Sequence, residues 1–238
     1  MRIRLPLGRT LLVLLFFLFA LIALLPLRIA VGAFGFAERG LTARAATGSV
    51  WLGALQEARV GPVALGDVKA RLNLLPLLLG RARLSLSSPD ANRPFEAATI
   101  VSRHGFGFED VSGRLRLGPL ASPLPLSTVD LQDVSVRFAS GRCTHAEGRV
   151  RAAAAGEVAG GSFAATLSGN ARCAGDALLL PLASQSGMEQ VNLRLFADGR
   201  YTAELLVRPA DAAARDRLIA AGFRPAGRAF GIRLDGRF

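Results

Sequence analysis

The sequence predicts a mainly β protein, with an N-terminal transmembrane helix, a curved antiparallel β-sheet domain and one short late helix. Three observations predict this fold class. An uncharged apolar run of eighteen residues stands near the start of the 238-residue chain. Most of the remaining chain alternates apolar and polar residues with a period of two, which is typical of half-buried strands. Helical periodicity is scarce after the apolar run, so we expect one β-rich domain.

The apolar run is the strongest local signal. It extends from Thr10 to Leu27, and Arg28 closes it. Eighteen helical residues rise about 27 Å, which is close to the ~30 Å of hydrocarbon in a bilayer. The run is also longer than the apolar core of about 7–15 residues in a signal peptide. We therefore predict a transmembrane helix.

Charge predicts the orientation of this helix. Three arginines precede the run, and cations are retained on the cytoplasmic side of a membrane. We expect a cytoplasmic tail at residues 1–9, a transmembrane anchor at 10–28 and a periplasmic β-rich domain at 29–238. A cleavage-like Val31-Gly32-Ala33 follows the run, so removal as a signal peptide remains the alternative. The three arginines are Arg2, Arg4 and Arg9.

Strict alternation marks the strands of the expected domain. In Asp67–Leu74 the even positions are apolar and the odd positions are polar, and Arg81–Leu86 repeats this pattern. Gly, Pro, Asn and Asp cluster between such runs, and Asp198-Gly199 is a good hairpin turn. The runs predict about nine to eleven antiparallel strands. Further runs are Gly113–Leu117, Val134–Phe138, Phe163–Ser168, Val191–Leu195, Tyr201–Val207 and Phe230–Leu234.

One late helix is expected through Ala212–Ala221. Asp211 can cap its N-terminus, and Gly222 can end it. Leu218 and Ile219 are expected on one face of this helix.

A short helical turn is also possible near Leu74–Leu79, and Gly80 would end it. Even with this turn, the expected helices are too few to cover a large sheet. The apolar strand faces must then meet in a sandwich-like or barrel-like core, or line a curved groove. A groove would offer an apolar lining to lipid or to another protein. Both the closed core and the open trough remain possible arrangements at this point.

No residue spacing typical of catalysis or cofactor binding occurs in the chain. It lacks a G-x-S-x-G elbow, a P-loop, an H-E-x-x-H helix and a C-x-x-C pair. His104 and His145 are its only histidines, which leaves little material for a metal cluster. Neighbouring strand residues such as Glu109 and Asp110 point to opposite faces, so we interpret this pair as solvated turn residues. We predict no enzyme, no catalytic residue, no cofactor and no metal.

The two cysteines fit a compartment outside the inner membrane. Cys143 and Cys173 lie 30 residues apart, and a pair in that compartment is usually oxidised. Closing such a loop would stabilise the fold by roughly 3–4 kcal/mol. We predict a disulfide, with two buried free thiols as the alternative. Cys143 with His145 as nucleophile and base is the weaker interpretation.

The charge balance does not indicate a nucleic-acid partner. The formal net charge is +11, and Lys69 is the only lysine among 29 cationic residues. The arginines are scattered along the chain, whereas a polyanion-binding surface clusters its cations. We interpret the arginine excess as genome composition. The hydrophobic content of 51% excludes wholesale disorder.

Several short motifs follow one another in a recognisable order along the chain. Thr47–Gly53 holds the only tryptophan, and it is similar to the G-T-x-W-x-G element of the type II secretion system protein N family, also called general secretion pathway protein N. The strand that ends at Leu74-Leu75-Pro76 is also similar, although Arg71 stands where members often carry a tryptophan. The resemblance covers nearly the whole chain. It continues through Leu77–Gly80, Gly141–Cys143, Gly169–Gly175, Tyr201, Val207–Pro209, Leu218, Gly222-Phe223 and Gly231–Gly236; the positions carried over as family-motif residues are Gly48, Trp51, Gly53, Gly80, Gly222 and Phe223.

The resemblance implies a single-pass inner-membrane protein of a Gram-negative bacterium. It would be a non-enzymatic accessory of the machinery that exports folded periplasmic proteins across the outer membrane. The implied partners are the lipid bilayer and other secretion-system proteins, with no nucleic acid. The one-faced strands also resemble AsmA-type proteins, which form lipid-handling β-grooves. A periplasmic AsmA-like lipid-binding or lipid-transfer module is therefore the alternative function, with lipid as its ligand.

Overall fold

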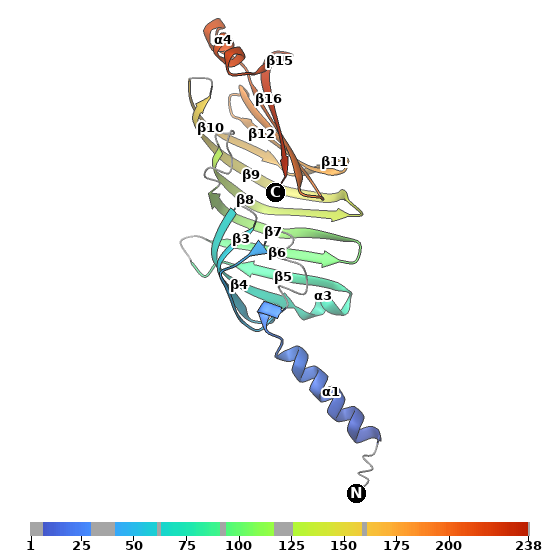
Figure 1. The fold of residues 1–238 in the computed structure, drawn as a ribbon. Helices are drawn as coiled ribbons and strands as arrows, with labels where there is room; N and C mark the ends of the chain where they lie inside the picture. The colour runs from blue at the N-terminus through green and yellow to red at the C-terminus, as the bar shows by residue number, and fades with distance from the viewer. Residues whose placement is uncertain are drawn as a thin grey trace.

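A single open antiparallel sheet forms the body of the protein in the computed structural model (Figure 1). The structure describes residues 7–29, 41–60, 63–90, 94–116, 126–158 and 161–237. The helices are α1 (Leu7–Ala23), α3 (Leu74–Leu78) and α4 (Ala212–Ala220). The strands are β1 (Leu41–Thr42), β2 (Ala45–Gly48), β3 (Gly53–Val60), β4 (Val63–Asn73), β5 (Arg81–Ser87), β6 (Phe95–Ser102), β7 (Gly105–Arg116), β8 (Leu126–Ala139), β9 (Arg142–Val158), β10 (Gly161–Asn170), β11 (Arg172–Ala174), β12 (Ala177–Ser184), β13 (Glu189–Phe196), β14 (Arg200–Val207), β15 (Arg224–Ala226) and β16 (Ala229–Arg237).

The strands follow one another through the sheet almost in chain order. The path runs β1-β3-β4-β5-β6-β7-β8-β9-β10-β12-β13-β14-β16-β15, while β2 pairs with β3 and β11 with β12. Short connections therefore join most neighbours, as expected for antiparallel hairpins. Helix α1 extends from one end of this ladder and α4 lies at the other end (Figure 1). The sandwich-like arrangement, in which two sheets face each other, is wrong.

The alternation of the sequence produces one apolar face. In β4, Val68, Ala70 and Leu72 are buried while Lys69 and Arg71 are exposed. The described residues form sixteen strands, which is more than the predicted nine to eleven. The extra strands were missed for physical reasons. β1, β2, β11 and β15 are too short to show a period, the alanine-rich end of β9 has weak contrast, and β12 is apolar on both faces.

The sheet curves strongly along its length, as predicted. β4 contacts β7 although two strands separate them in the sheet, and β10 contacts β13 across β12. A flat sheet would hold β4 and β7 about 14 Å apart. The curvature brings the apolar residues of one face together, so the sheet encloses its own core.

Two hydrophobic clusters fill this core, one after the other along the ladder. Cluster 1 gathers side chains from β8 to β14 with Leu218 and Phe223. Cluster 2 gathers side chains from β3 to β6 with Leu27 and Val50. Among the described strand residues, Phe108 is the one large apolar side chain that stays markedly exposed. Much of this face is therefore buried within one open, curved sheet, and the lipid-module alternative gains no support.

The three helices match the sequence in different degrees. The Asp211 side chain caps α4 by accepting a hydrogen bond from the Ala214 N–H at 2.6 Å. Leu218 is buried in cluster 1, but Ile219 is exposed, so the expected shared face is wrong. Residues one apart on a helix differ by about 100° in direction, and the neighbouring sheet reaches only one of them. α3 ends at Leu78, and Gly80 follows in the turn with φ +71°.

Helix α1 covers only part of the predicted anchor at 10–28. It ends at Ala23, and Pro26 forms an isolated bridge with Ser49 instead of continuing the helix. A proline lacks the N–H that a helix interior needs, so an end in this region is natural. Within the described ranges, no helix has both the length and the apolar character required to cross a membrane.

Candidate functional site

The tryptophan motif Thr47–Gly53 forms a junction between the chain leaving α1 and the sheet. The Val50 N–H donates to the Leu25 carbonyl at 3.0 Å, and the Val50 carbonyl accepts from the Leu72 N–H at 3.0 Å. Trp51 is half-buried against cluster 2. The motif therefore joins β4 to the segment that follows α1.

Two glycines make this junction possible. Gly48 has φ +82°, and a Cβ there would clash with the Leu52 carbonyl oxygen. A Cβ on Gly53 would lie 2.5 Å from Leu27 Cδ2. Leu27 is only 1% exposed and is a central member of cluster 2. Glycine at position 53 thus leaves the space in which Leu27 is buried.

The remaining family-motif residues are not among those that form this junction. Gly80 follows α3, while Gly222, with φ +88°, follows α4 at the other end of the sheet. The Phe223 N–H donates to the Leu218 carbonyl at 3.0 Å, and the Phe223 ring is buried in cluster 1. These three residues terminate helices and anchor a turn. The structure therefore brings together Gly48, Trp51 and Gly53, but not the other three.

The predicted disulfide is present. Cys143 on β9 and Cys173 on β11 are joined, with their Cα atoms 5.5 Å apart. The pair packs with cluster 1 and ties β11, which lies off the main strand path, to the middle of the sheet. Cys143 is therefore unavailable as a nucleophile for His145.

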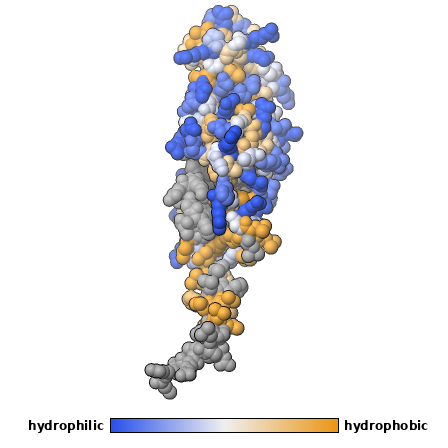
Figure 2. All heavy atoms as spheres, turned by 90° about the vertical axis from the view of Figure 1, so that its right-hand side faces the viewer, coloured by the Kyte–Doolittle hydropathy of each residue, from blue (hydrophilic) through white to orange (hydrophobic). Residues whose placement is uncertain are grey.

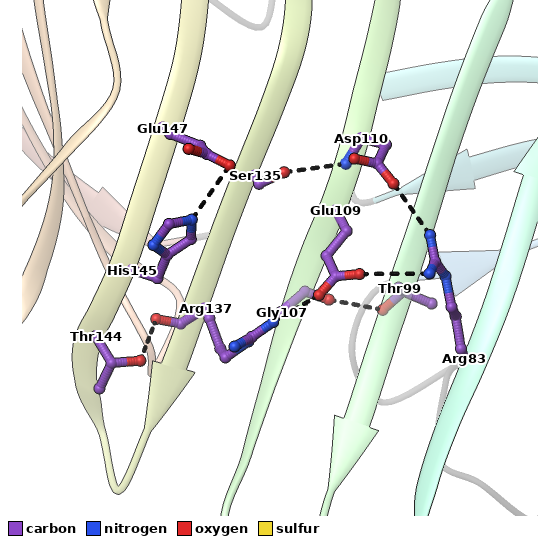
Figure 3. Close-up of polar contacts among 10 residues, drawn as sticks. All are labelled: Arg83, Thr99, Gly107, Glu109, Asp110, Ser135, Arg137, Thr144, His145 and Glu147. Carbon is purple, nitrogen blue, oxygen red and sulfur yellow. Dashed lines mark hydrogen bonds and ion pairs between the residues drawn. The ribbon is translucent and has the colours of Figure 1, made fainter. Parts of the chain in front are cut away.

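A polar cluster extends across neighbouring strands of the sheet (Figure 3). Arg83 and Arg137 in this cluster adjoin the buried residues Leu84 and Phe138, so they lie on the opposite face from the core. Glu109 and Asp110 both point toward Arg83 on β5. The Asp110 carboxylate lies 3.0 Å from one Arg83 nitrogen, and the Glu109 carboxylate lies 3.7 Å from another. Glu109 also accepts a hydrogen bond from Arg137 at 2.7 Å. Asp110 is solvated as expected, but both residues lie in β7 and face Arg83, so the prediction of a turn with the two side chains on opposite faces is wrong.

A β-bulge explains why two consecutive residues share a face. From Phe108 to Val111, β7 advances three residues while the facing β8 advances two. Asp110 takes φ +53° and donates its N–H to the Ser135 hydroxyl at 3.1 Å. One extra residue in a strand breaks the alternation of side chains. Periodicity alone could not reveal it, because a bulge has no fixed sequence signature.

The polar cluster pairs opposite charges across neighbouring strands. His145 lies 3.3 Å from Glu147 and close to Arg137, with both histidine and glutamate side chains exposed. Residues of β7, β8 and β9 line a shallow depression of about 160 Å³. No group of three potential metal ligands occurs in the described parts of the chain. The cluster links β5, β7, β8 and β9 across the outer face.

The two edges of the sheet differ in how they are covered. β1 and β2 pair with β3 and cover the edge near α1. At the far edge, β15 pairs only with Ala229–Gly231 of β16. No strand in the described ranges pairs with the outer side of 232–237. The sequence shows β16 as a strand but cannot show that it is an edge.

Charged groups line this far edge. Asp235 accepts a hydrogen bond from the Thr202 hydroxyl at 2.6 Å and lies 3.2 Å from the Arg233 guanidinium. The Thr202 hydrogen bond, followed by Arg233, lowers the pKa of the exposed Asp235 carboxyl. Charges of this kind discourage uncontrolled pairing between sheets while leaving the backbone accessible.

Comparison with known proteins identifies one family. The family model described as type II secretion system (T2SS), protein N matches residues 39–233. No curated protein and no solved structure matches the chain. The matched region runs from just before β1 into β16, so it contains the tryptophan junction, the disulfide and the polar cluster. The chain therefore belongs to the type II secretion system protein N family.

Proposed function

We propose that this protein is a non-enzymatic inner-membrane accessory of the type II secretion system, assisting assembly or the export of folded periplasmic proteins across the outer membrane. The family match over residues 39–233 carries the proposal, because it includes nearly the entire sheet. A component of this system is associated with the cell envelope. The ion pairs and the two hydrophobic clusters described above support a scaffold more than a reaction centre.

The membrane placement rests on the sequence and on the surface of α1. Three arginines precede the apolar run, which favours a cytoplasmic tail at 1–9, an anchor at 10–28 and a periplasmic domain at 29–238. The side chains from Leu11 to Phe17 are all exposed and apolar. Such a helix requires an apolar environment, and a bilayer would supply it.

The free edge of β16 is the proposed contact with another secretion protein. An extended segment can add to an open sheet edge through main-chain hydrogen bonds. The edge near α1 consists of the short strands β1 and β2, whereas β16 leaves the outer side of the longer stretch 232–237 without a partner strand in the described ranges, so we choose β16. This contact would place the partner along the edge strand that ends the ladder opposite β1–β3, which runs from beside α4 down to the C-terminus (Figure 1).

Deletion of the gene tests the secretory role. In the deletion strain, we expect exported enzymes to accumulate in the periplasm, and the full-length chain should restore their appearance in the medium. A resident periplasmic protein serves as the control for leakage. Normal secretion by the deletion strain would contradict the proposal.

A fusion tests the placement separately. Alkaline phosphatase joined after Phe238 should be active, because that enzyme requires export for its disulfides. Membrane fractions should retain the fusion after alkaline carbonate washing. An inactive fusion would overturn the periplasmic placement, and release by carbonate would overturn the anchor.

A further inference from the structure

A group of exposed leucines lies at the end of the sheet that carries α1. Leu52 is 67% exposed, and Leu74, Leu75 and Leu79 are 59%, 78% and 79% exposed. These four residues are called the leucine patch. Figure 2 shows hydrophobic residues gathered at this end of the domain, whereas much of the upper part of the same face is hydrophilic. Large exposed apolar groups that cluster usually mark an interaction surface.

Hydrogen bonds place the leucine patch beside the exit of α1. Val50 is bonded to Leu25 on one side and to Leu72 on the other, each at 3.0 Å. Leu74, the first patch residue of α3, follows Leu72 by two positions, and Leu52 follows Val50 by two. Leu77 packs into cluster 2 together with Leu27, which fixes α3 against the same core. Hydrogen bonds and packing therefore hold the leucine patch in place at this end of the domain.

The patch continues an apolar surface that begins on α1. Leu24, at the end of α1, is also strongly exposed. Exposed arginines border this region, with Arg28 after α1 and Arg81 directly after Gly80. Leucines flanked by arginines suit the boundary between acyl chains and anionic headgroups, because the arginines can reach the phosphates. A protein partner would need no such continuity with α1.

We propose that the leucine patch rests in the headgroup–acyl boundary of the bilayer into which α1 inserts. This inference depends on the membrane placement proposed above. The contact would add a second attachment point beside α1. It would also set the direction in which the strand ladder leaves the membrane.

A fluorescent label tests this contact in the full-length protein. Both native cysteines are in the disulfide, so Leu75→Cys provides a single reactive thiol for an environment-sensitive nitrobenzoxadiazole label. Ile219→Cys is the matched control, because Ile219 is an exposed apolar residue on α4 at the opposite end. The protein is reconstituted into vesicles of phosphatidylethanolamine and phosphatidylglycerol, with or without lipid that carries a shallow nitroxide. Leu79→Cys repeats the test if the first variant folds poorly.

We expect the label at position 75 to emit at shorter wavelength than the label at 219 and to lose most of its emission to the nitroxide lipid. Equal quenching of both labels by aqueous iodide, with no effect of the nitroxide, would overturn the inference. Cross-linking between two copies through position 75 would also overturn it and assign the patch to a dimer. Flotation of the vesicles separates the two proposals. Protein that floats with an exposed label refutes the patch contact alone, and protein that does not float refutes the anchor as well.

Discussion

Gly53 and Leu27 differ in size and in role, yet the burial of Leu27 depends on the absence of a side chain at Gly53. Leu27 belongs to the apolar run by sequence, yet it is buried in the core of the sheet. Gly53 supplies the space, since its missing Cβ would lie 2.5 Å from Leu27 Cδ2. This pair gives the family glycine a physical role that the motif alone does not reveal.

We expect Gly53→Ala to lower the free energy of unfolding by about 1–3 kcal/mol, because the new methyl group overpacks the junction. It would also lie 2.9 Å from the Ser49 carbonyl oxygen. Denaturant unfolding of the full-length protein in detergent measures the change. In a Leu27→Ala background Gly53→Ala should lower the free energy of unfolding by a smaller amount, because substitutions at contacting residues do not have additive effects on stability. An equal cost in both backgrounds would show that Leu27 is not the opposing group.

The Thr202–Asp235 hydrogen bond should set the acid behaviour of the far edge. Thr202→Val removes the first cause of the lowered pKa of Asp235, so we expect this pKa to rise toward its ordinary value. A carboxyl-detected NMR titration measures the shift, with Asp198 as the internal control, because Arg200 lowers its pKa instead. An unchanged pKa of Asp235 would contradict the assignment.

The sign of the stability effect follows from the direction of this shift. The pKa of folded Asp235 lies below the unfolded value of about 4. Its contribution to stability is therefore present above that unfolded value and is lost as the pH falls through the folded pKa. The Thr202→Val protein should lose less stability on acidification than the parent. Because Asp235 is exposed, the difference should be small and should shrink in salt.

At the scale of elements, the bulge in β7 organises the outer face. It turns Asp110 toward Arg83 and breaks the alternation that the flanking residues follow. Without the extra residue, Glu109 and Asp110 would lie on opposite faces.

Two substitutions at Asp110 isolate the backbone contribution. Asp110→Gly and Asp110→Val both lose the ion pair with Arg83, but only valine is strained at φ +53°. We expect the valine variant to be less stable than the glycine variant by about 1–2 kcal/mol in denaturant unfolding. Equal stabilities would mean that the bulge relaxes to extended geometry when Asp110 is replaced.

The disulfide stabilises the attachment of β11. Replacing Cys143 and Cys173 together by alanine should lower the free energy of unfolding by about 3–4 kcal/mol, because the loop of 30 residues is no longer closed. The same urea titration of the oxidised and reduced parent provides the control. If reduction and double substitution both leave the midpoint unchanged, the cross-link does not stabilise the fold.

The sequence predicts strands well where one face is apolar and the other is polar, as in β4 and β14. The Asp211 cap and the turn at Gly80 also follow from local chemistry. The sequence predicts strands poorly where the two faces of a strand do not differ in polarity, as in β12, or where a bulge inserts one residue, as at Asp110. The junction at Gly53 was found only as a motif, because its partner Leu27 reads as part of the apolar run. Long-range packing decided these cases.

At the scale of the whole molecule, two core clusters succeed each other along one ladder. Molecules built this way contact mainly their neighbours along the chain, so stability can vary along their length. Cluster 1 includes the disulfide and α4, whereas cluster 2 includes the junction with α1. The polar cluster spans β5 to β9 on the opposite face and so bridges the two regions.

We expect Leu167→Ala to cost about 2–5 kcal/mol, because Leu167 is fully buried in cluster 1. Amide hydrogen exchange should accelerate in β8 to β14 more than in β3 to β5. Ser168→Ala is the matched control, since Ser168 is the exposed neighbour on the opposite face, and its cost should stay within about 0.5 kcal/mol. Uniform acceleration across all strands would indicate a single cooperative unit.

The burial of Leu27 beneath Gly53 also bears on how far the edge at β16 lies from α1. Leu25 and Leu27 attach the chain to the sheet within a few residues of the end of α1 at Ala23. Eleven strand spacings of about 4.8 Å lie between β3 and β16, or roughly 53 Å measured along the curved sheet. A flexible tether would let the distance between the free edge of β16 and the bilayer vary widely, whereas an attached ladder keeps this distance nearly constant. In the proposed orientation the protein would therefore meet its partners only at a fixed distance from the bilayer.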